Sequence, residues 1–274
     1  MKLSSWKTTL AFALAACVGF NVGNVGRAQN ASPNCSATSR DYYAKSEYVT
    51  VEGNGARDVA KECDKIVKGL EKRYGKPKRW RSFPVRFAPG KSKYVAGYTR
   101  YVEPNVIEVK IYQTFEESRG GTLDHELTHA FFFYYFDSNF NLLLNEGLAQ
   151  NSETINRARY RDLVYRRYIA GEFDSLERLY RLESYDFKLL IYTQGFGVVD
   201  FLIARGGSKW FAAFVDDLTE NERELDDALL RFYGYRSVKE LEKDWLEYVG
   251  KGQDRAKTRA LGRTGTWTGI DCDY

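Results

Sequence analysis

The sequence contains little histidine, little methionine and few long hydrophobic runs. Its 274 residues include two histidines and a single methionine, Met1. A membrane-spanning helix needs about eighteen or more consecutive apolar residues. The longest apolar run lies near the N-terminus and is shorter than this, and no other stretch reaches that length. The sequence therefore does not predict a membrane-spanning helix.

The chain also lacks an excess of charge of one sign. Its formal net charge is +4 at pH 7. Removing residues 1–28 takes away Lys2, Lys7 and Arg27 and no acidic residue, which lowers the net charge to +1. A domain that binds nucleic acid usually has a strongly basic patch or stripe. We therefore expect no nucleic-acid partner.

The N-terminus has the pattern of a signal peptide. Two lysines precede an apolar run of thirteen residues from Thr8 to Phe20, which is too short to cross a bilayer. Gly26-Arg27-Ala28 is a suitable cleavage site, so we expect residues 1–28 to be removed. The competing site is Leu14-Ala15-Ala16-Cys17, which resembles a bacterial lipobox and would leave a lipid anchor on Cys17. Both alternatives predict an extracytoplasmic protein, either secreted or periplasmic, or else a membrane-anchored lipoprotein.

Three cysteines remain after export, namely Cys35, Cys63 and Cys272. Exported proteins can keep disulfides. Cys63 belongs to an apolar stripe with a spacing of three or four residues, so we expect it to be a buried thiol in a helix. Three single bridges are possible, and the one we expect joins Cys35 to Cys272, near the two ends of the mature chain.

The two histidines lie four residues apart, in His125-Glu126-x-x-His129. On a helix this spacing puts both imidazoles on one face, where they can bind the same zinc ion at about 2.0–2.1 Å. Glu126 would then reach a water molecule on the metal without being a ligand itself. This is an H-E-x-x-H signature of zinc hydrolases. The alternative is a helix with two unrelated histidines.

A catalytic zinc ion usually has three protein ligands and one open position. Because no histidine is left, the third ligand must be a carboxylate or a cysteine. Glu146 follows His129 by seventeen residues and lies in the otherwise apolar segment from Leu142 to Ala149, apart from Asn145. A carboxylate in such a segment is costly unless it is paired or coordinated. We therefore expect one zinc ion per chain with Glu146 as third ligand; the alternative is an ordinary exposed glutamate.

These motifs resemble those of the gluzincin metallopeptidases, and more narrowly the bacterial peptidase MA-like domains, whose third ligand lies in a Glu-Gly-x-Ala segment. Here that segment is Glu146-Gly147-Leu148-Ala149. The block from Ile191 to Leu202 is similar to the tyrosine-bearing helix of aminopeptidase-type gluzincins. The resemblance implies a zincin-like fold and gives Tyr192 the role of stabilising the oxyanion. The alternative for Tyr192 is a core tyrosine.

Two related classes are excluded by composition. Metzincins need a third histidine and a methionine turn. The aminopeptidase G-x-M-E-N motif needs an internal methionine, so removal of N-terminal residues is not the expected activity. Many gluzincins have a carboxylate four residues after the third ligand, where it supports a zinc-bound histidine. This chain has Gln150 there, and its carbonyl can still accept a hydrogen bond from an imidazole N–H.

The predicted fold class is α+β, with an N-terminal mixed sheet and helices, followed by a mostly helical lobe after Gly121. We expect the zinc cleft between these two lobes. Alternation and β-branched residues predict strands, and a spacing of three or four apolar residues predicts a helix. The predicted strands are Glu47–Val51, Pro84–Ala88 and Asn105–Tyr112, and the predicted helix is Gly55–Tyr74.

The predicted organisation is a linker over residues 29–45, a metallopeptidase domain over 46–250 and a C-terminal tail over 251–274. The expected function is hydrolysis of peptide bonds by a zinc-activated water, with Glu126 as general base. A peptide or protein substrate is expected to pair with the edge of the strand at 105–112. The alternative is a zinc-retaining binding module with weak or no hydrolytic activity.

Overall fold

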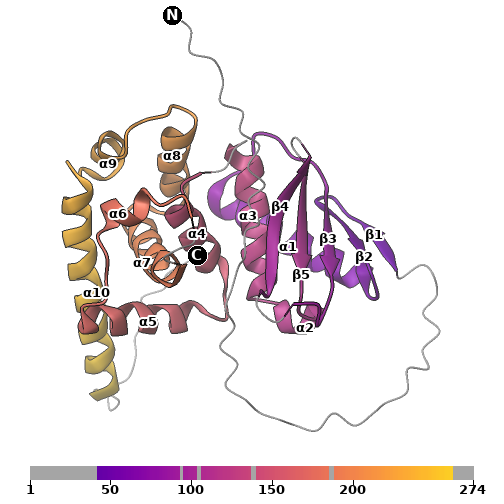
Figure 1. Ribbon diagram of the computed structural model, residues 1–274, viewed down its shortest axis with the longest axis horizontal. Coiled ribbons are helices and arrows are strands. Elements are labelled where there is room, and N and C mark those ends of the chain that lie inside the picture. The colour runs from indigo at the N-terminus through magenta and orange to yellow at the C-terminus, as the bar shows by residue number, and fades with distance from the viewer. Residues whose placement is uncertain (1–41, 93–94, 104–105, 137–139, 185–187, 262–274) are drawn as a thin grey trace, which may run out of the picture.

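The structure is a computed structural model that describes residues 42–261, apart from 93–94, 104–105, 137–139 and 185–187 (Figure 1). The predicted signal peptide, the lipobox with Cys17, and Cys35 and Cys272 lie outside the described residues. Within the described ranges, no helix is both long enough and apolar enough to span a bilayer.

The predicted α+β class is confirmed: a five-stranded mixed sheet precedes a mostly helical part. The strand order is β1-β2-β3-β5-β4. The three central strands, β2, β3 and β5, run parallel, whereas β1 and β4 are antiparallel to their neighbours. The strands are β1 (Tyr43–Lys45), β2 (Val49–Glu52), β3 (Phe83–Phe87), β4 (Gly97–Glu103) and β5 (Val106–Ile111).

The sheet differs from the sequence expectation at two places. The strand expected at 105–112 is β5, which pairs with β3 on one side and β4 on the other, so it has no free edge. The prediction that a peptide pairs with β5 is therefore wrong. The edge strand beside it is β4, which the sequence did not reveal. In addition, β1 falls within the segment expected to be a linker at 29–45.

One face of the sheet is covered by α1 (Ala56–Tyr74) and α3 (Thr122–Phe136) (Figure 1). The helix expected at 55–74 is thus confirmed as α1, and Cys63 on it is a buried free thiol, also as expected. Between β5 and α3 lies α2 (Phe115–Ser118), whose start is fixed by a capping box between Thr114 and Glu117.

The helical part contains two central helices, α4 (Leu142–Ser152) and α7 (Lys188–Gly206), which pack against each other. Figure 1 shows these helices beside the sheet, with α3 and α4 where the two parts meet. The last helix continues into the segment expected to be a tail at 251–274. The other helices are α5 (Arg157–Ala170), α6 (Leu176–Tyr180), α8 (Ser208–Thr219), α9 (Leu225–Tyr233) and α10 (Val238–Leu261).

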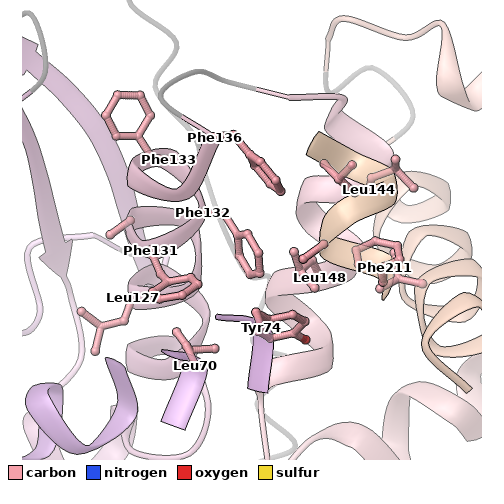
Figure 2. Packing of buried hydrophobic residues seen from close by; sticks show 14 of the residues in the cluster. Leu70, Tyr74, Leu127, Phe131, Phe132, Phe133, Phe136, Leu144, Leu148 and Phe211 are labelled. Carbon is pink, nitrogen blue, oxygen red and sulfur yellow. The ribbon is translucent and has the colours of Figure 1, made fainter. Parts of the chain in front are cut away.

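Both sides of α3 are buried. Figure 2 shows Phe132 and Phe136 pointing toward Leu144 and Leu148 of α4, while Phe131 lies on the side toward α1. A helix that is hydrophobic all round belongs in a protein interior. The candidate metal ligands on α3 are therefore carried by the most enclosed element of the fold.

The crossing of α4 and α7 depends on two glycines. A Cβ atom on Gly147 would lie 2.2 Å from the carbonyl oxygen of Gly195, and one on Gly195 would lie 2.6 Å from that of Leu143. The Asn151 amide joins the same helices by donating to the carbonyls of Gly147 (2.9 Å) and Phe196 (3.1 Å). The close approach fixes the position of α4, the helix that carries Glu146.

We predict that Gly147→Ala destabilises the protein by about 1–3 kcal/mol, the usual cost of overpacking a core, because the added methyl group meets backbone atoms of α7. The matched control is Gly69→Ala within α1, where an added Cβ meets nothing within 4 Å. That change should stabilise the helix by roughly 0.5–1 kcal/mol. Urea unfolding measures both. Equal stabilities of the two variants would contradict the close helix crossing.

Candidate metal centre

The helix α3 brings the two histidines together, as the sequence predicts. Its first turn follows two glycines, and the Asp124 carboxylate accepts a hydrogen bond from the Gly120 N–H at 2.9 Å. An acidic side chain here also interacts favourably with the N-terminal end of the helix dipole. One turn separates His125 and His129, and their Nε2 atoms lie 3.1 Å apart. The first ring is fully buried and the second residue is 5% exposed.

The helix α4 adds Glu146. Its start is capped by the Asn141 side chain, which accepts from the Leu143 and Leu144 N–H groups. The fully buried Glu146 has Oε2 3.4 Å from His125 Nε2 and 3.6 Å from His129 Nε2.

Hydroxyl groups hold α4 in register with α3. The Thr128 and Ser152 hydroxyls are 2.7 Å apart, and both lie within hydrogen-bond distance of the Asp124 carbonyl.

Both imidazoles are held from their outer nitrogen. His125 Nδ1 lies 2.7 Å from Glu153 Oε1, and His129 Nδ1 lies 2.8 Å from Asn145 Oδ1. Carboxylate and amide oxygens only accept, so each Nδ1 carries the proton and donates it. The Nε2 atom of each ring then presents a lone pair toward the other ring and toward Glu146, which is the tautomer that binds a metal ion.

The distances between His125 Nε2, His129 Nε2 and Glu146 Oε2 fit a metal ion. Two ligand atoms bound tetrahedrally at about 2.0–2.1 Å lie roughly 3.4 Å apart. The three distances here are 3.1, 3.4 and 3.6 Å. Three lone-pair atoms converge in a site that is almost completely buried, and a cation between them would stabilise this arrangement. Among the described residues, His125, His129 and Glu146 thus form a buried group that can hold a metal ion.

The electrostatics of the site agree with this. Burial raises the pKa of Glu146, but electrostatic attraction to the neighbouring His129 and His125 rings outweighs burial and holds the pKa well below its ordinary value. Glu146 is therefore a carboxylate at neutral pH. A bound cation would act in the same direction.

Glu126 lies between the ligands along α3 but takes no part in the group of three. It is fully buried, and its Oε2 accepts a hydrogen bond from the Thr99 hydroxyl at 2.8 Å. Burial raises its pKa against the opposing effects of the two histidines and Thr99. A carboxylate with a raised pKa beside a candidate metal site is suited to accept and return a proton.

Tyr192 lies next to the three candidate ligands. It comes from the first half of α7 and its ring centroid lies 6.4 Å from that of His125. It is 8% exposed. The structure therefore brings Tyr192 to the side of the predicted ligands, although it does not assign a role to the hydroxyl.

Gln150 does not support a histidine, contrary to the sequence expectation, since its Oε1 is buried without a hydrogen-bond partner among the described residues. Glu153 takes that role for His125, and its Oε2 accepts from Asn156 (2.6 Å) and Tyr160 (2.8 Å). Sequence analysis missed Glu153. The available signal was its position seven residues after Glu146, two helical turns along the same face.

Comparisons with known proteins add no assignment: no protein-family model matches this chain, and no curated protein matches it either. The relationship to gluzincins remains a prediction based on the motifs.

We predict that Glu153→Gln weakens metal binding by about 10–100-fold, the usual effect of removing the partner of a ligating histidine. Glutamine keeps the size of the side chain but removes the charge opposite His125 Nδ1. Gln150→Leu is the control and should leave metal affinity unchanged, because it removes an oxygen without a hydrogen-bond partner. Competition with a chromophoric chelator measures both affinities. A weaker metal affinity in Gln150→Leu than in Glu153→Gln would contradict the assignment of Glu153, rather than Gln150, as the partner that supports His125.

Proposed function

We propose that this chain is a zinc-dependent metallopeptidase that holds one zinc ion through His125, His129 and Glu146. The observation that carries the proposal is the convergence of these three side chains beside the Glu126 carboxylate. This carboxylate is not one of the three candidate ligands and is hydrogen-bonded to Thr99 instead. Two imidazoles and one carboxylate are a ligand set of known catalytic zinc sites, whereas structural zinc sites are mostly rich in cysteine.

Each residue has a defined task in peptide hydrolysis. Zinc in this site would supply a Lewis acid and lower the pKa of a bound water toward about 7. Glu126 accepts the proton of the attacking water and donates it to the leaving amine. Tyr192, beside His125, donates a hydrogen bond to the oxyanion of the tetrahedral intermediate. Glu153 and Asn145 keep the two imidazoles in the ligating tautomer.

The second candidate is a zinc-retaining binding module without hydrolytic activity. The observation in its favour is enclosure: His125, Glu126 and Glu146 are fully buried. A binding module would not need a carboxylate at position 126, which is costly to bury and binds no metal in this arrangement. We therefore favour the enzyme. Zinc content without cleavage of any peptide in a diverse library would support the binding module.

We propose further that the protein works outside the cytoplasm on peptides or proteins. The support is the signal-like N-terminus over residues 1–28 and the alternative lipid attachment at Cys17. Edman sequencing of the mature protein from the cell that makes it distinguishes these forms, since the first expects a free N-terminus after Ala28 and the second a blocked Cys17.

We predict that Glu126→Gln retains one zinc per chain but lowers kcat for peptide cleavage by about 10²–10⁴-fold, the range for loss of a general base. His129→Ala is the contrasting variant, because it removes a ligand and should lose zinc as well as activity. Metal analysis after dialysis and cleavage of a peptide library measure both properties. An undiminished rate in Glu126→Gln would show that another group acts as base.

Tyr192→Phe tests the proposed oxyanion donor. We expect kcat to fall by about 10²–10³-fold, with KM and zinc content nearly unchanged, because the hydroxyl acts mainly in the transition state. A tyrosine that only fills the core would instead leave kcat unchanged and affect the melting temperature. Measuring kcat and melting temperature on the same variant separates the two roles.

A further inference from the structure

The edge strand β4 packs against the side chain of Glu126. Gly97 and Thr99 are two residues apart, so they lie on the same face of β4, which is the face toward α3. A Cβ atom on Gly97 would lie 3.1 Å from Glu126 Cγ and 2.9 Å from Thr122 Cγ2. The missing side chain at position 97 therefore leaves room for the aliphatic stem of Glu126.

Thr99 contacts the polar end of the same side chain. Its hydroxyl is buried and lies 2.8 Å from Glu126 Oε2 and 2.9 Å from the Glu126 carbonyl oxygen. Both are acceptors, so the single hydroxyl proton is donated within Glu126 itself. A hydrogen bond to a carboxylate is about twice as strong as one between neutral groups, which favours Oε2 as the acceptor.

The other carboxylate oxygen, Glu126 Oε1, is buried and has no hydrogen-bond partner among the described residues. The last torsion of a glutamate side chain is broad, so the side chain alone does not fix the plane of its carboxylate. Among those residues, the bond from Thr99 is the side-chain hydrogen bond that fixes this plane. Holding Oε2 leaves Oε1 as the oxygen available to a water molecule.

The strand itself is anchored on its opposite face. Arg100 points away from Thr99 and donates to Glu108 Oε2 of β5 at 2.8 and 3.0 Å. Arg86 of β3 donates to the other oxygen of Glu108 at 2.5 Å. In the backbone ladder Thr99 lies opposite Val109. These contacts fix the position of the hydroxyl relative to the central strands.

We propose that Thr99 is a positioning residue that orients the Glu126 carboxylate for proton transfer in the peptidase reaction. This inference rests on the proposed function, because it concerns the base of that reaction. The edge strand β4 then has two roles. It completes the sheet, and its face toward α3 sets the orientation of the Glu126 carboxylate. A residue that acts in this way should affect the rate only through Glu126.

The test compares Thr99→Val, which keeps the shape and removes the hydroxyl, with Thr99→Ser, which keeps the hydroxyl and removes a methyl group. We expect Thr99→Val to lower kcat by about 10–100-fold, the loss of one hydrogen bond to a charged group, with KM and zinc content unchanged. Thr99→Ser should stay within about threefold of the wild type. If Thr99→Val does not fold, Thr99→Ala replaces it.

The decisive measurement is the same change in the Glu126→Gln background. If Thr99 acts through Glu126, adding Thr99→Val there should cause no further loss of kcat, because residues that act as a unit are not additive. A full second loss in that background, equal losses in Thr99→Ser and Thr99→Val, or an undiminished kcat in Thr99→Val would each overturn the inference. A wild-type protein that binds zinc and cleaves no peptide would overturn the proposed function, and with it this inference; the other outcomes leave the proposed function intact.

Discussion

The cost of burying charge where α3 meets α4 is the constraint on which the rest of the structure depends. Two carboxylates and two imidazoles lie there almost without exposure, and an isolated buried charge is expensive. Both imidazoles and the Glu126 carboxylate are therefore bound to a polar partner from another element of the fold. Glu153 and Asn145 hold the imidazoles, and Thr99 holds Glu126. The sheet and the helical part are both needed to supply these partners.

The helix α4 connects these requirements. Within a little more than two turns, α4 and the residue that ends it supply Asn145, Glu146 and Glu153. It can do so only because it is pressed closely against α7 at Gly147, and because Phe132 and Phe136 of α3 fix its other side (Figure 2). The apolar packing and the polar site are thus two aspects of the same helix arrangement. A shift of α4 would move Glu146 and the partners of both histidines together.

Local pattern was sufficient to predict the candidate ligands, because each signal lies within a single helix, α3 for the histidines and α4 for the glutamate. The i, i+4 spacing gave His125 and His129, and an isolated carboxylate in an apolar segment gave Glu146. The helix α1 and the strand β5 followed from periodicity in the same way.

The missed features depend on contacts that are distant in sequence. The strand β4 has glycine, tyrosine, threonine and arginine without apolar alternation, because one face packs on Glu126 and the other carries an ion pair. For the same reason nothing near Thr99 in the sequence points to its partner, which is 27 positions away. Whether Glu153 or Gln150 contacts His125 depends on where α4 ends, and helix ends are poorly defined by sequence.

The enclosure of the ligands also has a kinetic consequence. His125 and Glu146 are fully buried and His129 is 5% exposed, so release of an ion held by them would be coupled to opening of the contact between α3 and α4, and such openings are local unfolding events with their own free energy. Loss of metal to a strong chelator would then proceed at the rate of opening and become independent of the chelator concentration. In the cell, an ion held in this way would be acquired while the protein folds, so that the supply of metal at the moment of folding would decide whether a given molecule is loaded.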